Sequence, residues 1–450
     1  MSPYTVTKTT SWFERLGKSF GGIIVGLILF VAATILLWWN EGNFVKTQVA
    51  LKEAQGVTQE LPDISKVDTS LNGQLVHAVG PAETKDILED PVFGISINAI
   101  RLERSVEFYQ WVEHTKTDRR EKLGGGEETI TTYSHLPDWV SKPENSDSFA
   151  DPSARIEKKN TVIYPLENLI VQAQNVTFGA YGLPKFLIDK ISNSESFSPK
   201  LSDATIAELN NKMGVPASPP VTAPPSNTPA QVSPPLLQAF TVDVAEPANE
   251  SPTTNDNPTP LLLPAPSSWV HVSGNTVYLG RDPSSPTVGD VRITFKQTLP
   301  GTVSLIAKLN GNTFENFVAK NGREVGLLSV GTHSAENMYE SAHTANTVFT
   351  WILRIVGIVL VCLSLGLITA PLSVLASVVP FLGRLVGAGT GIVCVLLGLA
   401  WSLLIIALAW LFYRPLFGIL LLVVVVALVA LLYRRGQAAG QQDKQQMKMT

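Results

Sequence analysis

The chain contains very little cysteine. Only Cys362 and Cys394 occur among its 450 residues, and both lie inside apolar stretches near the C-terminus. The polar part of the chain therefore has no disulfide framework to hold it together. A polar region of roughly 230 ordered residues is large enough to be stabilised by its own hydrophobic core instead.

The chain also lacks a strong charge imbalance. Its formal net charge is −4 at pH 7. Binding to nucleic acid requires a clustered basic face, because the phosphate backbone is bound through Lys and Arg. The sequence therefore predicts no nucleic-acid partner.

The spacings that common catalytic and cofactor sites impose are absent as well. There is no H-E-x-x-H, no G-x-S-x-G, no P-loop and no dinucleotide fingerprint. One His/acid cluster comprises His333, Glu336 and His343, and the first two could share a helical face as metal ligands. A capped helix near a membrane surface would show the same residues without a metal. We therefore predict no catalytic residue, no metal site and no cofactor.

Long apolar sequence, in contrast, is abundant. Three C-terminal runs, residues 348–370, 388–412 and 416–433, each approach the roughly 20 apolar residues that cross a bilayer as a helix. A soluble helix of that length would carry charges along its outer face. Here the few arginines lie at or near the ends of the runs. The runs predict transmembrane helices, and the absence of charge at their centres gives little indication of an ion path.

A fourth apolar run, residues 21–39, follows a basic N-terminal segment. A cleaved signal peptide would need a shorter apolar core and a small-residue cleavage site. The run instead ends in Trp38 and Trp39, a residue type that favours the bilayer interface, so we predict an uncleaved transmembrane helix. Gly22 and Gly26 have a spacing that permits another helix to approach closely, although glycine is also common in membrane helices for other reasons.

One early span and three late spans place both ends of the chain on the same side of the membrane. The positive-inside bias of residues 1–20 and 434–450 predicts that this side is the cytoplasm. Residues 40–347 would then lie on the opposite face, in the periplasm, the exterior or an organelle lumen. We expect the cell membrane as the location in a bacterium, and the endoplasmic reticulum or nuclear envelope in a eukaryote.

The region between the first two spans is predicted to be rich in β-strands. Residues 216–267 interrupt it with 14 of the chain's 30 prolines and no Lys or Arg, which indicates an extended insertion without a core. Short runs bounded by turn residues predict strands on both sides of the insertion. They are residues 74–79, 95–100, 106–112, 129–133, 269–272, 276–279, 291–296, 303–309 and 324–330.

Three local patterns add detail. Three consecutive glycines at residues 124–126 indicate a flexible loop or a hairpin tip. Ser334 is placed to cap a helix with Glu336 in its first turn, and this helix is expected to continue into the second span. The short apolar stretch 371–387 contains two prolines and predicts an interfacial or re-entrant segment on the cytoplasmic side.

Together these patterns predict an α+β membrane protein with four transmembrane helices, one N-terminal and three C-terminal. A large β-rich extramembrane domain lies between the first helix and the second. The predicted order is a cytoplasmic N-terminus at 1–20, the first span at 21–39, the first domain part at 40–215, the insertion at 216–267, the second domain part at 268–347, the second span at 348–370, the interfacial segment at 371–387, the third span at 388–412, the fourth span at 416–433 and a basic cytoplasmic tail at 434–450.

A series of short motifs also runs through the chain in a fixed order. The motif residues are Asn40, Glu41, Gly42, Tyr109, Gln110, Trp111, Gly289, Asp290, Ser334, Glu336, Tyr413, Arg414 and Pro415. Each motif is weak alone, but their order together with the helix layout is specific. In these features the chain resembles the transmembrane protein 43 (LUMA) family over nearly everything outside the insertion.

The resemblance implies an architecture and a class of role rather than a reaction. Animal members of the family look like four-span proteins of the endoplasmic reticulum and inner nuclear membrane with a large lumenal domain. They self-associate and help to organise envelope complexes with lamins and emerin. The family also has bacterial members of unclear role, and the brief N-terminus and compact tail favour a bacterial source for this chain. No catalytic residue is carried over from the family.

Three functions are compatible with the sequence. The first is a self-associating membrane scaffold that contacts lipids and whose domain binds neighbouring copies or other membrane or envelope proteins. The second is a membrane-bound hydrolase with a non-standard acid/His site, such as Glu336 and His333. The third is a transporter with a polar path through its spans. The glycine-spaced helices, the β-rich domain and the missing catalytic motifs favour the scaffold.

Overall fold

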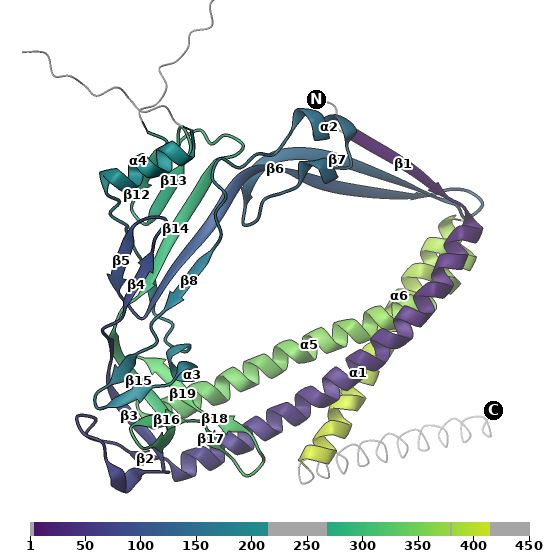
Figure 1. Cartoon of the computed structure of the whole chain (residues 1–450). Helices are drawn as coiled ribbons and strands as arrows, with labels where there is room; N and C mark the ends of the chain where they lie inside the picture. The colour runs from purple at the N-terminus through teal and green to yellow at the C-terminus, as the bar shows by residue number, and fades with distance from the viewer. Residues whose placement is uncertain (1–3, 215–267, 379, 415–450) are drawn as a thin grey trace, which may run out of the picture.

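The computed structural model describes residues 4–214, 268–378 and 380–414 (Figure 1). Three predicted segments lie outside the described residues: the insertion 216–267, the fourth span 416–433 and the tail 434–450.

Three long helices form the apolar part of the structure: α1 (Trp12–Val57), α5 (Ala335–Ala376) and α6 (Pro380–Tyr413). Each contains a stretch long and apolar enough to cross a bilayer, and these stretches correspond to the predicted first, second and third spans. The described part of the chain therefore holds three candidate spans rather than four.

Side-chain caps set the beginning of α1 and of α5. Ser11 accepts a hydrogen bond from the backbone N–H of Glu14 at 3.2 Å, and Ser334 accepts one from Asn337 at 3.3 Å. These contacts satisfy backbone donors that the first turn of a helix leaves free. The predicted helix that begins after Ser334 and continues into the second span is present, because α5 is unbroken to residue 376.

The predicted interfacial segment, residues 371–387, is not a separate element. α5 continues through Pro371 to Ala376, and α6 begins at Pro380. The apolar sequence on both sides of the turn explains this arrangement, because a helix satisfies its own backbone groups and is therefore the stable form in a bilayer.

The larger sheet has eight strands, several of which continue into a long ribbon (Figure 1). Its members are β1 (Tyr4–Thr10), β6 (Arg101–Glu121), β7 (Glu127–Val140), β8 (Leu169–Gln172), β11 (Ser194–Ser196), β12 (Val270–Ser273), β13 (Thr276–Leu279) and β14 (Val291–Thr298). The order is β1-β7-β6-β14-β13-β12, with β8 paired to β6 and β11 paired to β14.

The smaller sheet has seven strands in the order β19-β15-β16-β10-β9-β3-β2, and β15 also pairs with β3. Its members are β2 (Gln59–Glu60), β3 (Leu75–Thr84), β9 (Val176–Phe178), β10 (Tyr181–Leu183), β15 (Gly301–Asn310), β16 (Thr313–Glu315) and β19 (Leu327–Val330). The remaining elements are the strand pairs β4 (Ile87–Asp90) with β5 (Ile95–Asn98) and β17 (Phe317–Val318) with β18 (Glu324–Val325), and the short helices α2 (Pro152–Glu157), α3 (Lys185–Ile188) and α4 (Asp203–Lys212).

The strands before and after the insertion form one fold. β14 pairs antiparallel with β6, with Ile293 opposite Val106, and β15 pairs antiparallel with β3, with Leu305 opposite Ala78. All four residues belong to one buried hydrophobic cluster. Because each sheet takes strands from both parts of the domain, neither part could bury its apolar face alone.

The structure closes into a frame with the helices along one side (Figure 1). β1 and the outer halves of β6 and β7 form a three-stranded ribbon, and the tip of its β6–β7 hairpin lies beside the first turn of α1. At the other end of α1, Ala50 and Leu51 pack in a buried cluster with Leu75 of β3 and Ile306 of β15. The sheets therefore hold α1 at both of its ends.

The N-terminal segment belongs to the larger sheet, which we did not predict from the sequence. β1 pairs antiparallel with β7, from Tyr4 opposite Tyr133 to Thr10 opposite Glu127. Its threonine-rich sequence has no apolar alternation, because most of its side chains are exposed. The segment predicted as a cytoplasmic N-terminus, residues 1–20, therefore includes a strand and the first turns of α1.

This pairing constrains how the chain can sit in a membrane. Residues 4–10 lie beside residues 127–133 in the larger sheet. The predicted topology places residues 1–20 and 40–347 on opposite sides. In a single chain the β1–β7 pairing and this predicted topology are compatible only if the ribbon passes through the thickness of the bilayer.

Candidate functional site

A buried ion pair joins α1 to α5 near the end of the first predicted span. Glu41 is fully buried and Arg354 is 8% exposed. The guanidinium of Arg354 donates from Nε to Oε1 of Glu41 at 2.6 Å and from Nη2 to Oε2 at 2.7 Å. This bidentate geometry is the strongest form of such a contact. Each ion depends on the other, because an unpaired charge in an apolar environment is costly.

α6 contributes Trp410 to the same site. The indole Nε1 of Trp410 donates to Oε2 of Glu41 at 2.7 Å. The guanidinium carbon of Arg354 lies 4.7 Å from the ring centroid of Trp351 and 5.6 Å from that of Trp410, so two aromatic rings accompany the cation. An acid from α1, a cation from α5 and an indole from α6 thus hold three helices together.

Neighbouring polar groups extend this contact between α1 and α5. The side-chain amide of Asn40 donates to the carbonyl of Thr350 at 3.1 Å, and that of Asn346 donates to the carbonyl of Phe44 at 3.2 Å. The hydroxyl of Thr350 donates to the carbonyl of Asn346 at 2.7 Å. Because the first two bonds connect defined positions on the two helices, they fix how far along α5 the helix α1 lies.

Gly42 allows the end of α6 to approach α1. A Cβ atom at this position would lie 2.6 Å from the ring of Tyr413, closer than atoms pack, so the contact requires glycine. The guanidinium of Arg414 lies 5.1 Å from the ring centroid of Phe44. We call the cluster of Asn40, Glu41, Gly42, Arg354, Trp410 and Tyr413 the helix crossing.

The structure therefore brings together two motifs that lie far apart in the sequence. The motif at residues 40–42 meets the motif that contains Tyr413, and Pro415 lies outside the described residues. Arg354 and Trp410 complete the site, and we did not predict either of them as site residues. The available signal was a pair of isolated opposite charges, Glu41 just after the first span and Arg354 just inside the second, on helices that run in opposite directions.

A second group of motif residues meets where β14 begins. Tyr109 donates its N–H to the carbonyl of Asp290 at 2.9 Å, and Gly289 donates its N–H to the carbonyl of Tyr109 at 2.9 Å. The side-chain amide of Gln110 donates to the carbonyl of Thr161, and the N–H of Trp111 donates to the side chain of Asn160, both in the segment that follows α2. These motif residues therefore connect β6 to β14 and to the segment at residues 160–161.

Asp290 organises the turn that precedes β14. Its carboxylate accepts the backbone N–H of Thr287 at 2.7 Å and a hydrogen bond from the hydroxyl of Tyr278. Burial, followed by the hydrogen bond to Asp290, raises the pKa of Tyr278 well above its ordinary value. The phenol therefore remains a proton donor to Asp290, which suits a structural turn.

The residues of the His/acid cluster lie at the beginning of α5, where His333 and Glu336 make separate contacts. Ser334 is the cap of α5, and Glu336 is exposed in its first turn, where it lines an open cavity of about 530 Å³ with His343. The ring of His333 contacts the carbonyl of Val330 at 2.9 Å. Among the described residues no group of His, Cys, Asp and Glu side chains is arranged to hold a metal ion.

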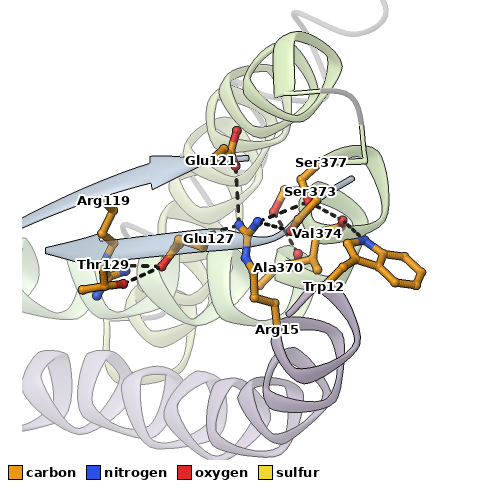
Figure 2. A network of polar contacts seen from close by, with 11 residues as sticks. Trp12, Arg15, Arg119, Glu121, Glu127, Thr129, Ala370, Ser373, Val374 and Ser377 are labelled. Atoms are coloured by element: carbon orange, nitrogen blue, oxygen red, sulfur yellow. Dashed lines mark hydrogen bonds and ion pairs between the residues drawn. The ribbon is translucent and has the colours of Figure 1, made fainter. Parts of the chain in front are cut away.

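A polar contact fastens the ribbon tip to the other end of the helices (Figure 2). Arg15 donates from Nη1 to the carbonyl of Gly125 at 2.7 Å, and its Nη2 lies 3.4 Å from both Glu121 and Glu127. The indole of Trp12 donates to the carbonyl of Val374 near the end of α5 at 2.9 Å. We call Trp12, Arg15, Glu121, Gly125 and Glu127 the hairpin latch.

The three consecutive glycines form the tip of the β6–β7 hairpin, one of the two forms predicted for them. Gly124 and Gly125 have φ angles of +87° and +80°, a backbone conformation that favours glycine. Gly124 also donates its N–H to the carbonyl of Val378 in the turn after α5, at 3.1 Å. The tip is therefore docked against both α1 and the α5–α6 turn.

Gly22 and Gly26 lie on the side of α1 that faces α5. A Cβ atom at Gly26 would lie 2.9 Å from the carbonyl oxygen of Ser364, and one at Gly22 would lie 3.6 Å from that of Leu367. The close approach that their spacing permits therefore occurs between two helices of the same chain.

Three apolar helices tied by a buried ion pair and joined to a two-sheet domain define an integral membrane protein of the α+β class. The sequence model of the family described as Transmembrane protein 43 matches residues 108–415, which is more than half of the chain. The chain belongs to this family.

Similar proteins match over nearly the whole chain. Human Transmembrane protein 43 is 29% identical over 442 residues, which cover 95% of this chain and 94% of the human protein. The mouse protein is 27% identical over 91% of this chain and 89% of its own length, and the Drosophila melanogaster homolog is 26% identical over 91% and 93%. No solved structure matches the chain.

Proposed function

We propose that this protein is a self-associating membrane scaffold whose β-rich domain binds neighbouring copies or other membrane proteins. The closed frame is the observation that carries this proposal. A scaffold must keep its binding surfaces at fixed positions relative to the bilayer. Because both ends of α1 are held by the sheets, the domain cannot swing freely about the helices.

The helix crossing supports the same role. Its buried ion pair and its tight glycine contact favour one arrangement of α1, α5 and α6 over others of similar apolar packing. We infer that these polar contacts select one arrangement of the helices, because apolar packing alone tolerates several. A helix bundle with a single arrangement suits an assembly element.

Membrane lipids are the first partner that the helices require. The outer side of α1 exposes an apolar stripe that includes Ile24, Ile28, Val31 and Ile35. Their spacing of three and four residues places them on one helical face. This face is available to lipid chains and, in an assembly, to helices of neighbouring proteins.

We also infer an orientation from the β1–β7 pairing. The ribbon exposes Lys116, Asp118 and Arg119, and such charges are too costly to place in hydrocarbon. The ribbon therefore stays in water, and residues 4–10 share the face of the domain. In this arrangement both ends of α1 lie on the same face, because α1 begins one residue after β1 and ends beside the smaller sheet, so α1 does not cross the bilayer as a single straight span.

The scaffold needs no catalytic residue, and the names of the relatives state no activity. Glu336→Gln and His333→Ala should therefore leave both the assembly and its thermal stability unchanged. A hydrolase that used this pair would lose its activity in these variants while remaining folded.

The mass of the protein extracted into nanodiscs from its own membrane tests the proposal. Native mass spectrometry should find a defined multimer, with or without another membrane protein. A monomer at all protein concentrations would overturn self-association, and a monomer that carries a small molecule would direct attention to the cavity beside Glu336.

A further inference from the structure

We propose that β1 is the surface through which two copies of this chain pair, by joining their larger sheets edge to edge. This inference rests on the proposed self-association and names its contact. β1 is the last strand of the larger sheet, next to β7. One row of its backbone N–H and C=O groups therefore faces away from the sheet, as a template for another strand.

β1 is the longest of the four strands that end the two sheet orders in the described part of the chain. The outer part of β6 also has an open edge, but that edge carries four charges, at Lys116, Asp118, Arg119 and Arg120. β1 has seven residues, whereas β12 at the opposite edge has four, and the edges β2 and β19 of the smaller sheet have two and four. Proteins protect exposed edges with short strands, prolines or charged side chains, especially lysine. β1 has no proline and a single charge, Lys8, and residues 5–9 are all exposed.

The sequence of β1 is compatible with antiparallel pairing to the β1 strand of a second copy. In an antiparallel pair with its two-fold axis at Thr7, Val6 lies opposite Lys8 and Thr5 lies opposite Thr9. No like charges are directly opposed, and threonine pairs across strands are favourable. Such a contact uses the same patch on both copies and closes after two, as in most symmetric dimers.

The strand is also held in place before any partner binds. A single residue, Ser11, separates β1 from α1, and the hairpin latch fixes the next turn through Arg15. All seven residues of β1 are already paired with β7. The strand therefore loses its conformational freedom when the chain folds, and it loses little more when a second copy binds.

A single cysteine on the proposed axis tests the contact. Thr7→Cys is made in the full chain with Cys362 and Cys394 replaced by serine, in membranes under mild oxidation. Residues opposite each other in an antiparallel pair have Cα atoms about 4.5–5.5 Å apart, which a disulfide can bridge. The expected product is a disulfide-linked dimer of twice the monomer mass.

Thr9→Cys is the matched control, because its side chain is on the same side of the strand as that of Thr7. In the proposed pair it faces Thr5 of the second copy, so the two cysteines are too far apart to join. Equal dimer from both variants would indicate random collision and overturn the inference.

The inference and the proposed function fail in different ways. A multimer in nanodiscs without a Thr7→Cys dimer would overturn edge pairing and leave the scaffold in place. A monomer in nanodiscs would remove both. A Thr7→Cys dimer without a Thr9→Cys dimer supports both.

Discussion

Glu41 and Arg354 show how a few polar atoms fix an apolar bundle. Apolar side chains tolerate many arrangements, because their attraction has no direction. The two hydrogen bonds of the ion pair fix α5 relative to α1, and the hydrogen bond from the indole of Trp410 to Glu41 fixes α6 relative to both. The three helices are therefore positioned by these residues, whereas their insertion follows from their apolar length.

Glu41→Gln should lower the free energy of unfolding by about 3–5 kcal/mol, because it leaves the buried guanidinium of Arg354 without its counter-ion. Reversible denaturant unfolding in micelles measures the change. Changing both residues, as Glu41→Gln with Arg354→Met, should recover part of the loss, since no buried charge then remains. Glu14→Gln, in the exposed pair with Lys18, is the control and should have no effect. Equal stability of Glu41→Gln and the unaltered chain would show that the pair is dispensable.

At this scale the motifs identified most of the helix crossing. They drew attention to residues 40–42 and to the stretch that contains Trp410 and Tyr413, but Arg354, the partner of Glu41, carried no motif. Glu41 and Arg354 are separated by 313 positions. Such a contact depends on how the helices pack, which local sequence patterns do not encode.

The contact between α1 and α5 depends on Gly26. Gly26→Ala should lower the free energy of unfolding by about 1–3 kcal/mol, because its Cβ would press on a backbone carbonyl of α5 that cannot move away alone. Gly21→Ala is the matched control on the same helix, since nothing lies within 4 Å of its Cβ. The measurement is again denaturant unfolding, and equal values for both variants would argue against the close approach.

The hairpin latch makes a prediction about the ribbon. Arg15→Gln removes the cation that lies between Glu121 and Glu127, so the tip should detach more often. Trypsin should then cleave at residues 119–122 faster than in the unaltered chain, as followed by mass spectrometry. Lys18→Gln, one turn further along α1, should leave the rate unchanged. An unaltered rate in Arg15→Gln would mean that the tip is held by other contacts.

Strands were predicted where one face is buried and missed where none is. The predicted runs 106–112 and 291–296 lie inside β6 and β14, whose side chains alternate between core and surface. β6 nevertheless continues to Glu121, through a ribbon with polar residues on both faces. β1 was missed for the same reason. These strands form through backbone pairing, which leaves no apolar alternation in the sequence.

At the scale of the whole molecule, the membrane topology is where sequence rules and structure differ most. Counting spans and charges gave an N-terminus on one face and a domain on the other. The structure closes a frame through β1, β7 and α1, which places the N-terminal strand beside the ribbon. Charge and hydropathy rules consider each segment alone, and a strand pairing between residues more than 100 positions apart lies beyond them.

A disulfide across β1 and β7 in native membranes is the most direct test of the closed frame. Val6 lies opposite Thr131, so Val6→Cys with Thr131→Cys, in the chain without Cys362 and Cys394, should form a bond within one chain. Val6→Cys with Glu128→Cys, three positions out of register, should not. Membrane-impermeant maleimide should then label Val6→Cys and a domain cysteine at Ser65 from the same side of sealed vesicles. Absence of the disulfide, or labelling from opposite sides, would contradict the frame.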